Sequence, residues 1–495
     1  MKSKFRPGIP LLPRSPGVSA TRWIGDSFRA AILEGRLRPG TRLPATRDIA
    51  RDYDLARGTV VTAFDQLKSE GYLETRTGSG TFVAGEIPDR HFTVLRSPAT
   101  RARPRNLHNT RRLSGYGRAV KSLPSGIGDR IRAFRSDVPA LDLFPTTLWA
   151  QIAGRRLRKA TTGMLRGCDP MGYRPLQEAV ADYLTTSRGV ACVPGQVAIV
   201  SGTQEALDLT ARLFLDKRDR VAIENPGYIG ATRVFEAAGA IVSHAAVDDQ
   251  GMVIDDSLDG ARLVYVTPAH QFPLGASMSI SRRLALLEWA FQSGAMIFED
   301  DYDSEFRYSG RPMPALQGLD EHGQVIFAGS FSKVMFPSLR LGYMVVPTDL
   351  IDRFAAAQSV SKRHAPLLDQ AVLADFLVEG HFGRHVRRMR QIYAWRLAVL
   401  LESAQLELAG LLEVSRVEAG LQTVAWLRPG LTAESVAVAA ARRGVEVTPL
   451  NRYARGRMHA DGLQIGFAAV DENEIRRGVR ELRLAIEDVQ RSLQP

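Results

Sequence analysis

Short apolar runs alternate with segments of helical spacing from residue 131 onward, and this alternation is the strongest constraint on the fold. The runs occupy residues 197–201, 221–224, 263–267, 295–299 and 325–328. Short apolar runs separated by helices are typical of buried strands in a largely parallel sheet. The sequence therefore predicts an α/β domain over residues 131–495.

Residues 1–84 predict a separate domain. Apolar residues recur at helical spacing over 19–34 and 57–70, and a shorter helix fits 46–52. Residues 71–83 are predicted to form two short strands around a glycine-containing turn. Three helices followed by a hairpin make a winged helix-turn-helix.

The positive charge is concentrated at the start of the chain. Residues 1–130 contain 24 Lys+Arg and 11 Asp+Glu, a net charge of +13, which leaves 41 and 42, or −1, for the remainder. A basic module joined to a nearly neutral body is typical of proteins that bind a polyanion. Residues 85–130 hold 10 Lys+Arg against 3 Asp+Glu without sustained periodicity, so they are predicted to be a basic flexible linker.

Two classes of protein are not expected. No apolar run approaches membrane-spanning length, and the first residues lead into prolines rather than into the apolar core of a signal peptide. We therefore expect a cytoplasmic protein with no membrane partner. The cysteines, Cys168 and Cys192, offer neither a disulfide framework nor a zinc-ligand cluster, so no metal site is expected.

The stretch Gly329-Ser330-Phe331-Ser332-Lys333, followed by Arg340, carries the chemistry of the predicted α/β domain. A partly desolvated lysine amine condenses with a carbonyl, and hydroxyls with an arginine suit a phosphate. Residues 201–204 lie between a predicted strand and a predicted helix, where amides form a natural phosphate cup. Together these residues predict a site for a phosphorylated aldehyde held as a Schiff base.

The N-terminal residues resemble the DNA-binding domain of GntR-type bacterial repressors. The resemblance rests on segments 43–50, 57–60, 71–73 and 78–83, which fall in the family's order and at its intervals. In that family the third helix enters the major groove and the wing lies against the DNA backbone. The resemblance implies that Arg47, Arg57 and Thr59 face DNA, and that Arg42, Ser79 and Gly80 contact phosphates.

The remainder, over residues 131–485, resembles fold-type I aminotransferases that use pyridoxal 5'-phosphate. The resemblance rests on the Lys333 motif and on loops 201–204, 224–228, 267–275 and 299–302. It implies that Lys333 forms the Schiff base, Asp300 pairs with the pyridine nitrogen, Tyr302 bonds the phenolic oxygen and Tyr228 stacks on the ring. It assigns Gly202, Thr203, Ser330, Ser332 and Arg340 to the phosphate, and places Gln204 and His270 in the same loops.

Two departures from the aminotransferase pattern argue against efficient turnover of amino acids. Gln464 stands where these enzymes commonly have a carboxylate-binding arginine, and Phe272 where they often have an asparagine. Glutamine brings no charge to a carboxylate and phenylalanine cannot bond the cofactor. Arg452, Arg455 or Arg457 remains open as a replacement, and residues 134–139 stand where relatives usually have a Pro-Gly turn.

Because it combines both resemblances, the chain is similar to the MocR (GabR-like) subfamily of GntR transcriptional regulators. The resemblance implies a homodimer, often head-to-tail, that binds double-stranded operator DNA. It implies an effector that is pyridoxal phosphate itself or an amino acid or amine forming an aldimine, with at most residual half-transamination. The alternatives are a true aminotransferase with an N-terminal DNA-binding arm, and a DNA-binding protein whose body is only a dimerisation scaffold.

Overall fold

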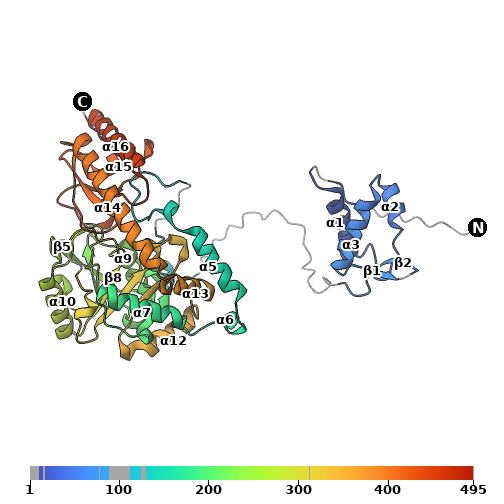
Figure 1. The fold of residues 1–495 in the computed structure, drawn as a ribbon, viewed down its shortest axis with the longest axis horizontal. Coiled ribbons are helices and arrows are strands. Elements are labelled where there is room, and N and C mark those ends of the chain that lie inside the picture. Colours follow the sequence, from blue (N-terminus) through green and yellow to red (C-terminus); the bar gives the residue numbers. More distant parts are fainter. Residues whose placement is uncertain are drawn as a thin grey trace, which may run out of the picture. The chain divides into compact units, whose positions relative to one another are not determined.

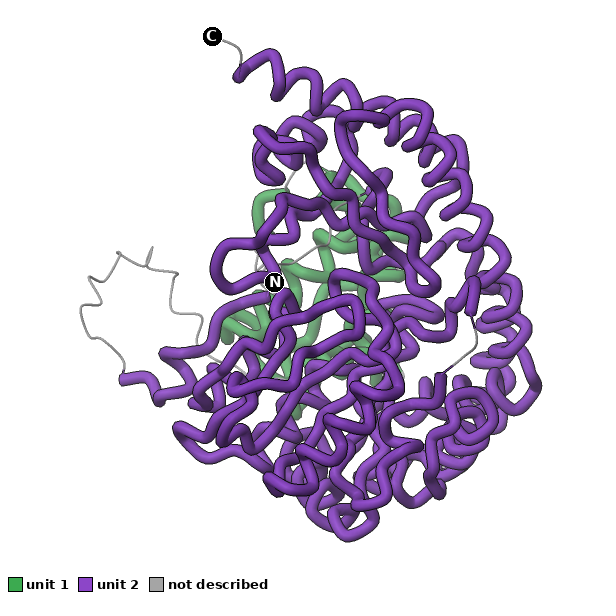
Figure 2. The backbone as a smooth tube through the Cα atoms, turned by 90° about the vertical axis from the view of Figure 1, so that its left-hand side faces the viewer, with its two compact units in different colours: residues 1–111 green, residues 112–495 purple. Residues whose placement is uncertain are grey.

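The chain forms two compact units, residues 1–111 and 112–495 (Figure 2). The computed structural model describes residues 11–14, 17–76, 78–87, 112–123, 130–310 and 313–493. Most of the predicted linker, 85–130, lies outside the described residues. Residues 112–123 belong to the second unit, where the short helix α4 (Gly115–Ala119) packs against α9 (Ile229–Ala238).

The first unit has the predicted winged helix-turn-helix fold. Its elements are α1 (Ala20–Leu33), α2 (Thr46–Asp52), α3 (Arg57–Ser69), β1 (Leu73–Arg76) and β2 (Gly80–Val83). The side chain of Ser19 accepts a hydrogen bond from the Arg22 amide and so caps α1. Phe28 of α1 and Phe64 of α3 meet edge to face with ring centroids 5.1 Å apart, and they are buried in a core confined to this unit.

The second unit contains an eight-stranded sheet in the order β3-β10-β9-β8-β7-β4-β5-β6. Figure 1 labels two of its strands, β5 and β8, among the helices of this unit. Its strands are β3 (Val197–Val200), β4 (Arg220–Asn225), β5 (Ile241–Asp248), β6 (Gly251–Met252), β7 (Ala261–Val266), β8 (Met296–Asp301), β9 (Val325–Ser330) and β10 (Gly342–Val345). Strands β9, β8, β7, β4 and β5 pair in parallel, and β10 is antiparallel to both of its neighbours. This arrangement confirms the predicted α/β fold.

Both faces of this sheet are buried, because successive residues of a strand enter different hydrophobic clusters. Ile199 and Phe327 belong to one cluster, whereas Val200 and Ile326 belong to another. Side chains alternate between the faces of a strand, so continuous apolar runs are required when both faces are covered.

Helices cover the large sheet and a smaller sheet near the C-terminus. The remaining helices are α5 (Thr146–Arg158), α6 (Thr162–Arg166), α7 (Arg174–Arg188), α8 (Thr203–Phe214), α10 (Ile280–Ser293), α11 (Phe331–Val334), α12 (Ile351–Ser361), α13 (Leu367–Val378), α14 (His381–Glu407), α15 (Ala433–Arg442) and α16 (Glu472–Leu493). The smaller sheet is antiparallel and contains β11 (Leu412–Val414), β12 (Gln422–Leu427), β14 (Gly462–Gly466) and β13 (Thr448–Pro449), in that order.

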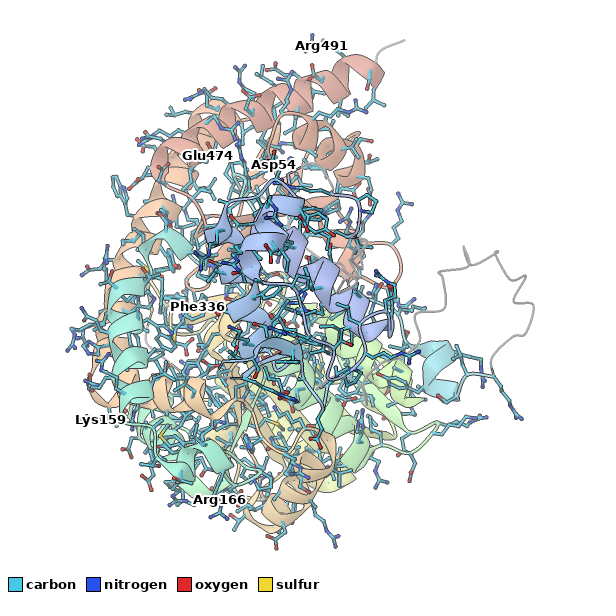
Figure 3. All side chains as sticks on the ribbon, turned by 90° about the vertical axis from the view of Figure 1, so that its right-hand side faces the viewer. Asp54, Lys159, Arg166, Phe336, Glu474 and Arg491 are labelled. Atoms are coloured by element: carbon cyan, nitrogen blue, oxygen red, sulfur yellow. The ribbon has the colours of Figure 1, made fainter. Side chains whose placement is uncertain are left out.

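The C-terminal helix α16 packs against α14 and α15. Glu474 and Arg491 mark its two ends in Figure 3, and its inner face is apolar, with Leu482 and Ile486 fully buried. Among the helices that the structure describes, none combines the length and the apolar character needed to cross a bilayer.

Candidate cofactor and DNA-binding sites

The predicted cofactor residues gather at one edge of the large sheet. β3 is antiparallel to β10, which is antiparallel to β9, so β3 points the same way as β9, β8, β7 and β4. The carboxyl ends of these strands therefore meet, and loops that follow them converge on one crevice. Thr203 follows β3, Tyr228 follows β4 and Phe272 follows β7. Asp300 is the second-last residue of β8, and Ser330 is the last residue of β9.

A cavity of about 270 Å³ lies at this edge. Its wall contains ten of the predicted cofactor residues: Gly202, Thr203, Gln204, Tyr228, Asp300, Tyr302, Ser330, Ser332, Lys333 and Arg340. Asp137, Tyr265, Phe272 and Pro337 complete the wall. The structure thus brings together residues that are spread along the sequence from Gly202 to Arg340.

Lys333 lies on the short helix α11, directly after β9. Its Nζ atom donates to the main-chain oxygen and to Oδ1 of Asp137, both at 2.9 Å. Asp137 precedes the large sheet in the chain, and its amide donates to the side-chain oxygen of Gln422 at 3.1 Å. A carboxylate therefore stands beside the nitrogen that is predicted to form the Schiff base.

Asp300 is the buried acid of the cavity, with 4% of its surface exposed. Its carboxylate accepts a hydrogen bond from the Tyr265 hydroxyl at 2.8 Å and a longer one from Thr203 at 3.4 Å. Burial raises the pKa of Asp300 to about 7, and these hydrogen bonds oppose the shift. A cation placed against this carboxylate would offset its desolvation, as the protonated pyridine nitrogen of the predicted cofactor does.

The acid that follows Asp300 faces the opposite side of the sheet. Asp301 is 5% exposed and forms an ion pair with Arg188 of α7, with N and O atoms 2.7 Å apart. Successive side chains of a strand point to opposite faces. Only Asp300 of this pair therefore serves the cavity.

Tyr228 and Phe272 provide the aromatic wall. The Tyr228 hydroxyl accepts a hydrogen bond from the Gln204 amide nitrogen at 3.0 Å, and burial raises the pKa of Tyr228 to about 12. Phe272 meets the Tyr228 ring edge to face with centroids 5.8 Å apart. Gln204 therefore positions Tyr228, and Phe272 presents an apolar surface where an asparagine would offer a donor.

Two of the residues predicted to hold the phosphate, Gly202 and Arg340, lie close together in the cavity wall. Gly202 has a φ of 123°, a conformation that favours glycine, and it precedes the N-terminus of α8. A Cβ atom at Gly202 would lie 4.0 Å from Nη1 of Arg340, so the guanidinium stands close to this turn. The hydroxyl of Ser332 is buried and has no hydrogen-bond partner. An unsatisfied buried hydroxyl suits an acceptor supplied by a ligand.

His270 is the one predicted cofactor residue that does not line the cavity. Its Nδ1 atom lies 3.1 Å from the Tyr302 hydroxyl and 2.9 Å from Oδ1 of Asp303. It is 3% exposed, and its Nε2 atom has no hydrogen-bond partner. The structure therefore places His270 beside Tyr302 as a positioning residue rather than in contact with the cavity.

Gln464 and the arginines near it do not provide a carboxylate clamp in the cavity wall. Gln464 is fully buried in β14, where its side-chain oxygen accepts a hydrogen bond from Tyr453 at 2.9 Å. Arg452 and Arg455 line a different cavity, and Arg457 lines neither. Within the described wall of the cofactor cavity the cationic residues are Lys333 and Arg340.

The residues of the cavity fit pyridoxal 5'-phosphate. A buried carboxylate without a cation, an unsatisfied serine hydroxyl and a lysine amine face one space of suitable size. Sequence reasoning missed Asp137 and Tyr265 in this wall. Tyr265 lies within a predicted strand, and the sequence does not show which strand residues face the cavity. Asp137 lies in segment 134–139, whose departure from the usual Pro-Gly turn was the signal that could have pointed to it.

The predicted DNA-contacting residues lie on the surface of the first unit. Arg47 is near the start of α2, Arg57 and Thr59 are at the start of α3, and Arg42 lies beside the wing. A Cβ atom at Gly80 of the wing would lie 3.3 Å from Nε of Arg42, so these two residues are adjacent.

Three of these arginines have no acidic partner among the described residues: Arg42, Arg47 and Arg57. Several other arginines of the unit are paired with acids, as Arg29 is with Glu70 at 2.6 Å. Ser79 is exposed at the tip of the wing. Exposed guanidinium groups without carboxylate partners suit phosphate contacts.

Two family models match the chain, one for each unit. The model of bacterial regulatory proteins of the gntR family matches residues 21–83. The model of class I and II aminotransferases matches residues 142–482. Together they cover the winged helix and almost all of the cofactor-binding unit.

Relatives of similar length combine both units. A probable rhizopine catabolism regulatory protein, MocR of Rhizobium meliloti, is 40% identical over 476 residues, covering 96% of this chain and 95% of that protein. The pyridoxine biosynthesis transcriptional regulator PdxR of Corynebacterium glutamicum is 30% identical over 483 residues, covering 97% and 98%.

Solved structures match the second unit. The α-aminoadipate aminotransferase LysN of Thermus thermophilus, complexed with N-(5'-phosphopyridoxyl)-L-leucine, matches with a TM-score of 0.68 and 28% identity over 73% of this chain and 94% of that chain. The kynurenine aminotransferase of Pyrococcus horikoshii, solved with PMP, matches with a TM-score of 0.67 and 26% identity over 74% and 92%. This chain therefore belongs to the MocR-type GntR transcriptional regulators, which join a winged helix to an aminotransferase-like domain that binds pyridoxal phosphate.

Proposed function

We propose that operator binding by the winged helix is controlled by a primary amine that occupies the pyridoxal phosphate site, without turnover. The observation that carries this proposal is the wall of the cofactor cavity. It keeps the lysine, the buried acid and the phosphate cup, but it contains a carboxylate, Asp137, and no guanidinium apart from Arg340 beside Gly202. A site built in this way supports capture of an amine more readily than catalysis on amino acids.

We propose which residues of the wall hold the cofactor. Lys333 would supply the amine, Asp300 would pair with the pyridine nitrogen, and Gly202, Thr203, Ser330, Ser332 and Arg340 would hold the phosphate. When bound, pyridoxal phosphate supplies an aldehyde that condenses reversibly with primary amines. Tyr265 and Thr203 hold the Asp300 carboxylate in place by hydrogen bonds, and Gln204 orients Tyr228.

The charges of the wall define the class of effector. Lys333 and Asp137 form an ion pair that is neutral overall, and the other cation of the described wall, Arg340, lies beside Gly202 at the predicted phosphate site. The wall therefore offers no unpaired cation for a carboxylate beside the effector's amine. We therefore propose an amine without such a carboxylate, including polyamines and hydroxylated amines.

The effector site and the DNA-binding site are coupled through a difference in ligand affinity between two states of the protein. A ligand shifts the DNA-binding equilibrium only to the extent that it binds two states of the protein differently, and the effect is reciprocal. Operator DNA should therefore change the affinity for the amine by the same factor. We also propose that the regulator acts in the cytoplasm as a head-to-tail homodimer. A dimer carries two winged helices, which would match an operator with two half-sites.

A second candidate function is a true aminotransferase. It is favoured by the complete set of Lys333, Asp300 and Tyr302, and by 29% identity to a 2-aminoadipate transaminase of Thermus thermophilus over 72% of this chain and 90% of that enzyme. Steady-state transfer between common amino acids and keto acids at ordinary enzyme rates would establish it and would contradict control without turnover.

The experiment that tests the proposal is a mobility shift on the DNA flanking this gene. The protein is loaded with pyridoxal phosphate and titrated with ethanolamine and serine, and with putrescine and ornithine, pairs that differ by one carboxylate. We expect the amines to change the operator affinity and the amino acids to act only at much higher concentration. A shift that is insensitive to cofactor and to every amine would contradict the proposed control.

A further inference from the structure

A second cavity, of about 230 Å³, shares no lining residue with the cofactor cavity. One wall comes from the connection between β4 and α9, where Gly227 and Ile229 flank the cofactor residue Tyr228. Another wall comes from residues 452–455, and Lys121 reaches the cavity from the described segment 112–123. The main chain joins the first two walls, because the Gly227 amide donates to the Tyr453 carbonyl at 3.0 Å.

Basic side chains are concentrated around this cavity. Lys121, Arg233, Arg452 and Arg455 line it, against Glu224 and Glu236. Arg455 and Glu236 are paired with N and O atoms 2.9 Å apart, which leaves three cations and one acid. Residues 131–495 carry 41 Lys+Arg and 42 Asp+Glu, so the cluster does not reflect a basic background.

Two buried polar atoms at this cavity lack partners. Nη1 of Arg233 and Oε1 of Glu224 are both buried, and neither has a hydrogen-bond partner. Glu224 is 1% exposed, and its other oxygen accepts a hydrogen bond from Thr267 at 2.5 Å. Burial raises the pKa of Glu224 to about 7. A buried guanidinium nitrogen without a partner is costly, and an anionic ligand would satisfy it.

We propose that this cavity binds a small organic dianion, a phosphate ester or a dicarboxylate, as a second effector. Arginine matches the geometry of both groups with two parallel hydrogen bonds. A water molecule occupies about 30 Å³ of liquid, so the cavity has room for a ligand of several non-hydrogen atoms. Arg233 and Arg452 bind the anion.

The position of Lys121 gives the site a regulatory consequence. Lys121 follows α4, which packs against α9, and it belongs to the described segment that comes first in the second unit. A dianion bound by Lys121 and Arg233 fixes this segment to α9 and to the connection that carries Tyr228. The dianion therefore acts on the part of the unit nearest in sequence to the winged helix.

Calorimetric titration of the full-length protein tests the site. The protein is first saturated with pyridoxal phosphate, so that the phosphate cup beside Gly202 is filled, and is then titrated with glycerol phosphate and with succinate. We expect one binding event per chain for at least one probe. The Arg233→Ala and Arg452→Ala variants should each weaken it at least about tenfold. Arg353→Ala, at an exposed position of α12, is the matched control and should bind normally.

Lys121→Ala keeps the test valid if the half-buried Arg233 is needed for folding, because Lys121 is exposed. It should weaken binding and leave thermal unfolding unchanged. Preference for one of the two probes identifies the ligand as a phosphate or a dicarboxylate. Absence of binding, or binding that all three variants retain, would overturn the proposal. A loss of operator affinity in the variants without any probe would also overturn it, because the arginines would then contact DNA.

Discussion

The Nζ atom of Lys333 lies 2.9 Å from both Oδ1 and the main-chain oxygen of Asp137. The nucleophile of the cofactor site is thus held by a segment that lies 196 residues away in the chain. Because the partner is a carboxylate, the same contact sets the charge of the cavity beside Lys333.

Replacing Asp137 with asparagine should reduce the preference for amines over amino acids. Two unit charges 4 Å apart interact by about 1 kcal/mol in water and by about 4 kcal/mol at the effective dielectric constant of a protein surface. We therefore expect the ratio of apparent affinities for ethanolamine and serine to fall by about tenfold or more. Titration of the absorbance of the bound cofactor measures both affinities.

The control for this substitution is Asp142→Asn, which removes a nearby exposed carboxylate that does not line the cavity. An unchanged ratio in Asp137→Asn, with the cofactor still bound, would refute the amine preference and leave the regulator assignment standing. A protein that never takes up pyridoxal phosphate would instead count against the cofactor site itself.

Lys333→Ala should abolish the covalent chromophore and the response to amines while retaining DNA binding, since Lys333 lies in the second unit and not in the winged helix. Borohydride reduction followed by mass spectrometry should find the cofactor on Lys333 in the wild type and on no residue in the variant. Lys159→Ala, an exposed lysine at the end of α5 (Figure 3), is the matched control. A reducible adduct that persists in Lys333→Ala would show that another amine holds the cofactor.

Asp300→Asn should make the cofactor-free protein less sensitive to rising pH. Burial raises the pKa of Asp300 to about 7, well above its value in an unfolded chain. The folded state then binds the proton more tightly, so the stability from this group is complete below about pH 4 and is lost as pH rises through 7. The wild type should lose about 2 to 3 kcal/mol relative to the variant between pH 5 and pH 8.

Urea unfolding of both cofactor-free proteins at the two pH values measures this difference. Glu224 and Glu299, whose pKa values burial also raises to about 7, are present in both proteins and cancel in the comparison. Equal pH dependence in the two proteins would mean that the Asp300 carboxylate is already stabilised in its charged form.

Arg47→Ala and Arg57→Ala should each weaken operator binding and reduce its dependence on salt. Each phosphate contact that is lost lowers the slope of log affinity against log salt concentration by about 1. Arg22→Ala is the control, because Arg22 is equally exposed but faces Asp26, with N and O atoms 3.8 Å apart. Fluorescence anisotropy over a range of salt concentrations gives the slopes, and variants that behave like Arg22→Ala would exclude these arginines from the interface.

The sequence predicted the strands that form the edge of the site, because continuous apolar runs are required where both faces of a sheet are buried. β4 spans Arg220–Asn225 where the predicted run is 221–224, and β9 spans Val325–Ser330 where the predicted run is 325–328. β10 and β5 were not predicted. β5 is only partly buried, so its residues do not form a continuous apolar run. β10 is buried and its residues 343–345 are apolar, but this run is short and follows Gly342, which weakens the local strand signal.

The site was predictable as a set of loops but not in its contacts. Parallel strands bring their carboxyl ends together whatever the loops contain, so residues such as Thr203 and Asp300 could be grouped from the sequence. The pairing of Asp137 with Lys333 depends on how the chain before the sheet crosses its edge, which no local pattern encodes. His270 shows the same limit, because the loop that carries it was correct while its contact is with Tyr302 and Asp303.

The opposed faces of Asp300 and Asp301 give β8 a fixed register. The two residues are chemically identical, yet one serves the cavity and the other pairs with Arg188 of α7. A slip of one position would place either Tyr302 against Arg188 or Glu299 at the cavity, so one of the two faces would carry the wrong side chain. An error of register in β8 is therefore penalised either at the buried ion pair or at the cavity.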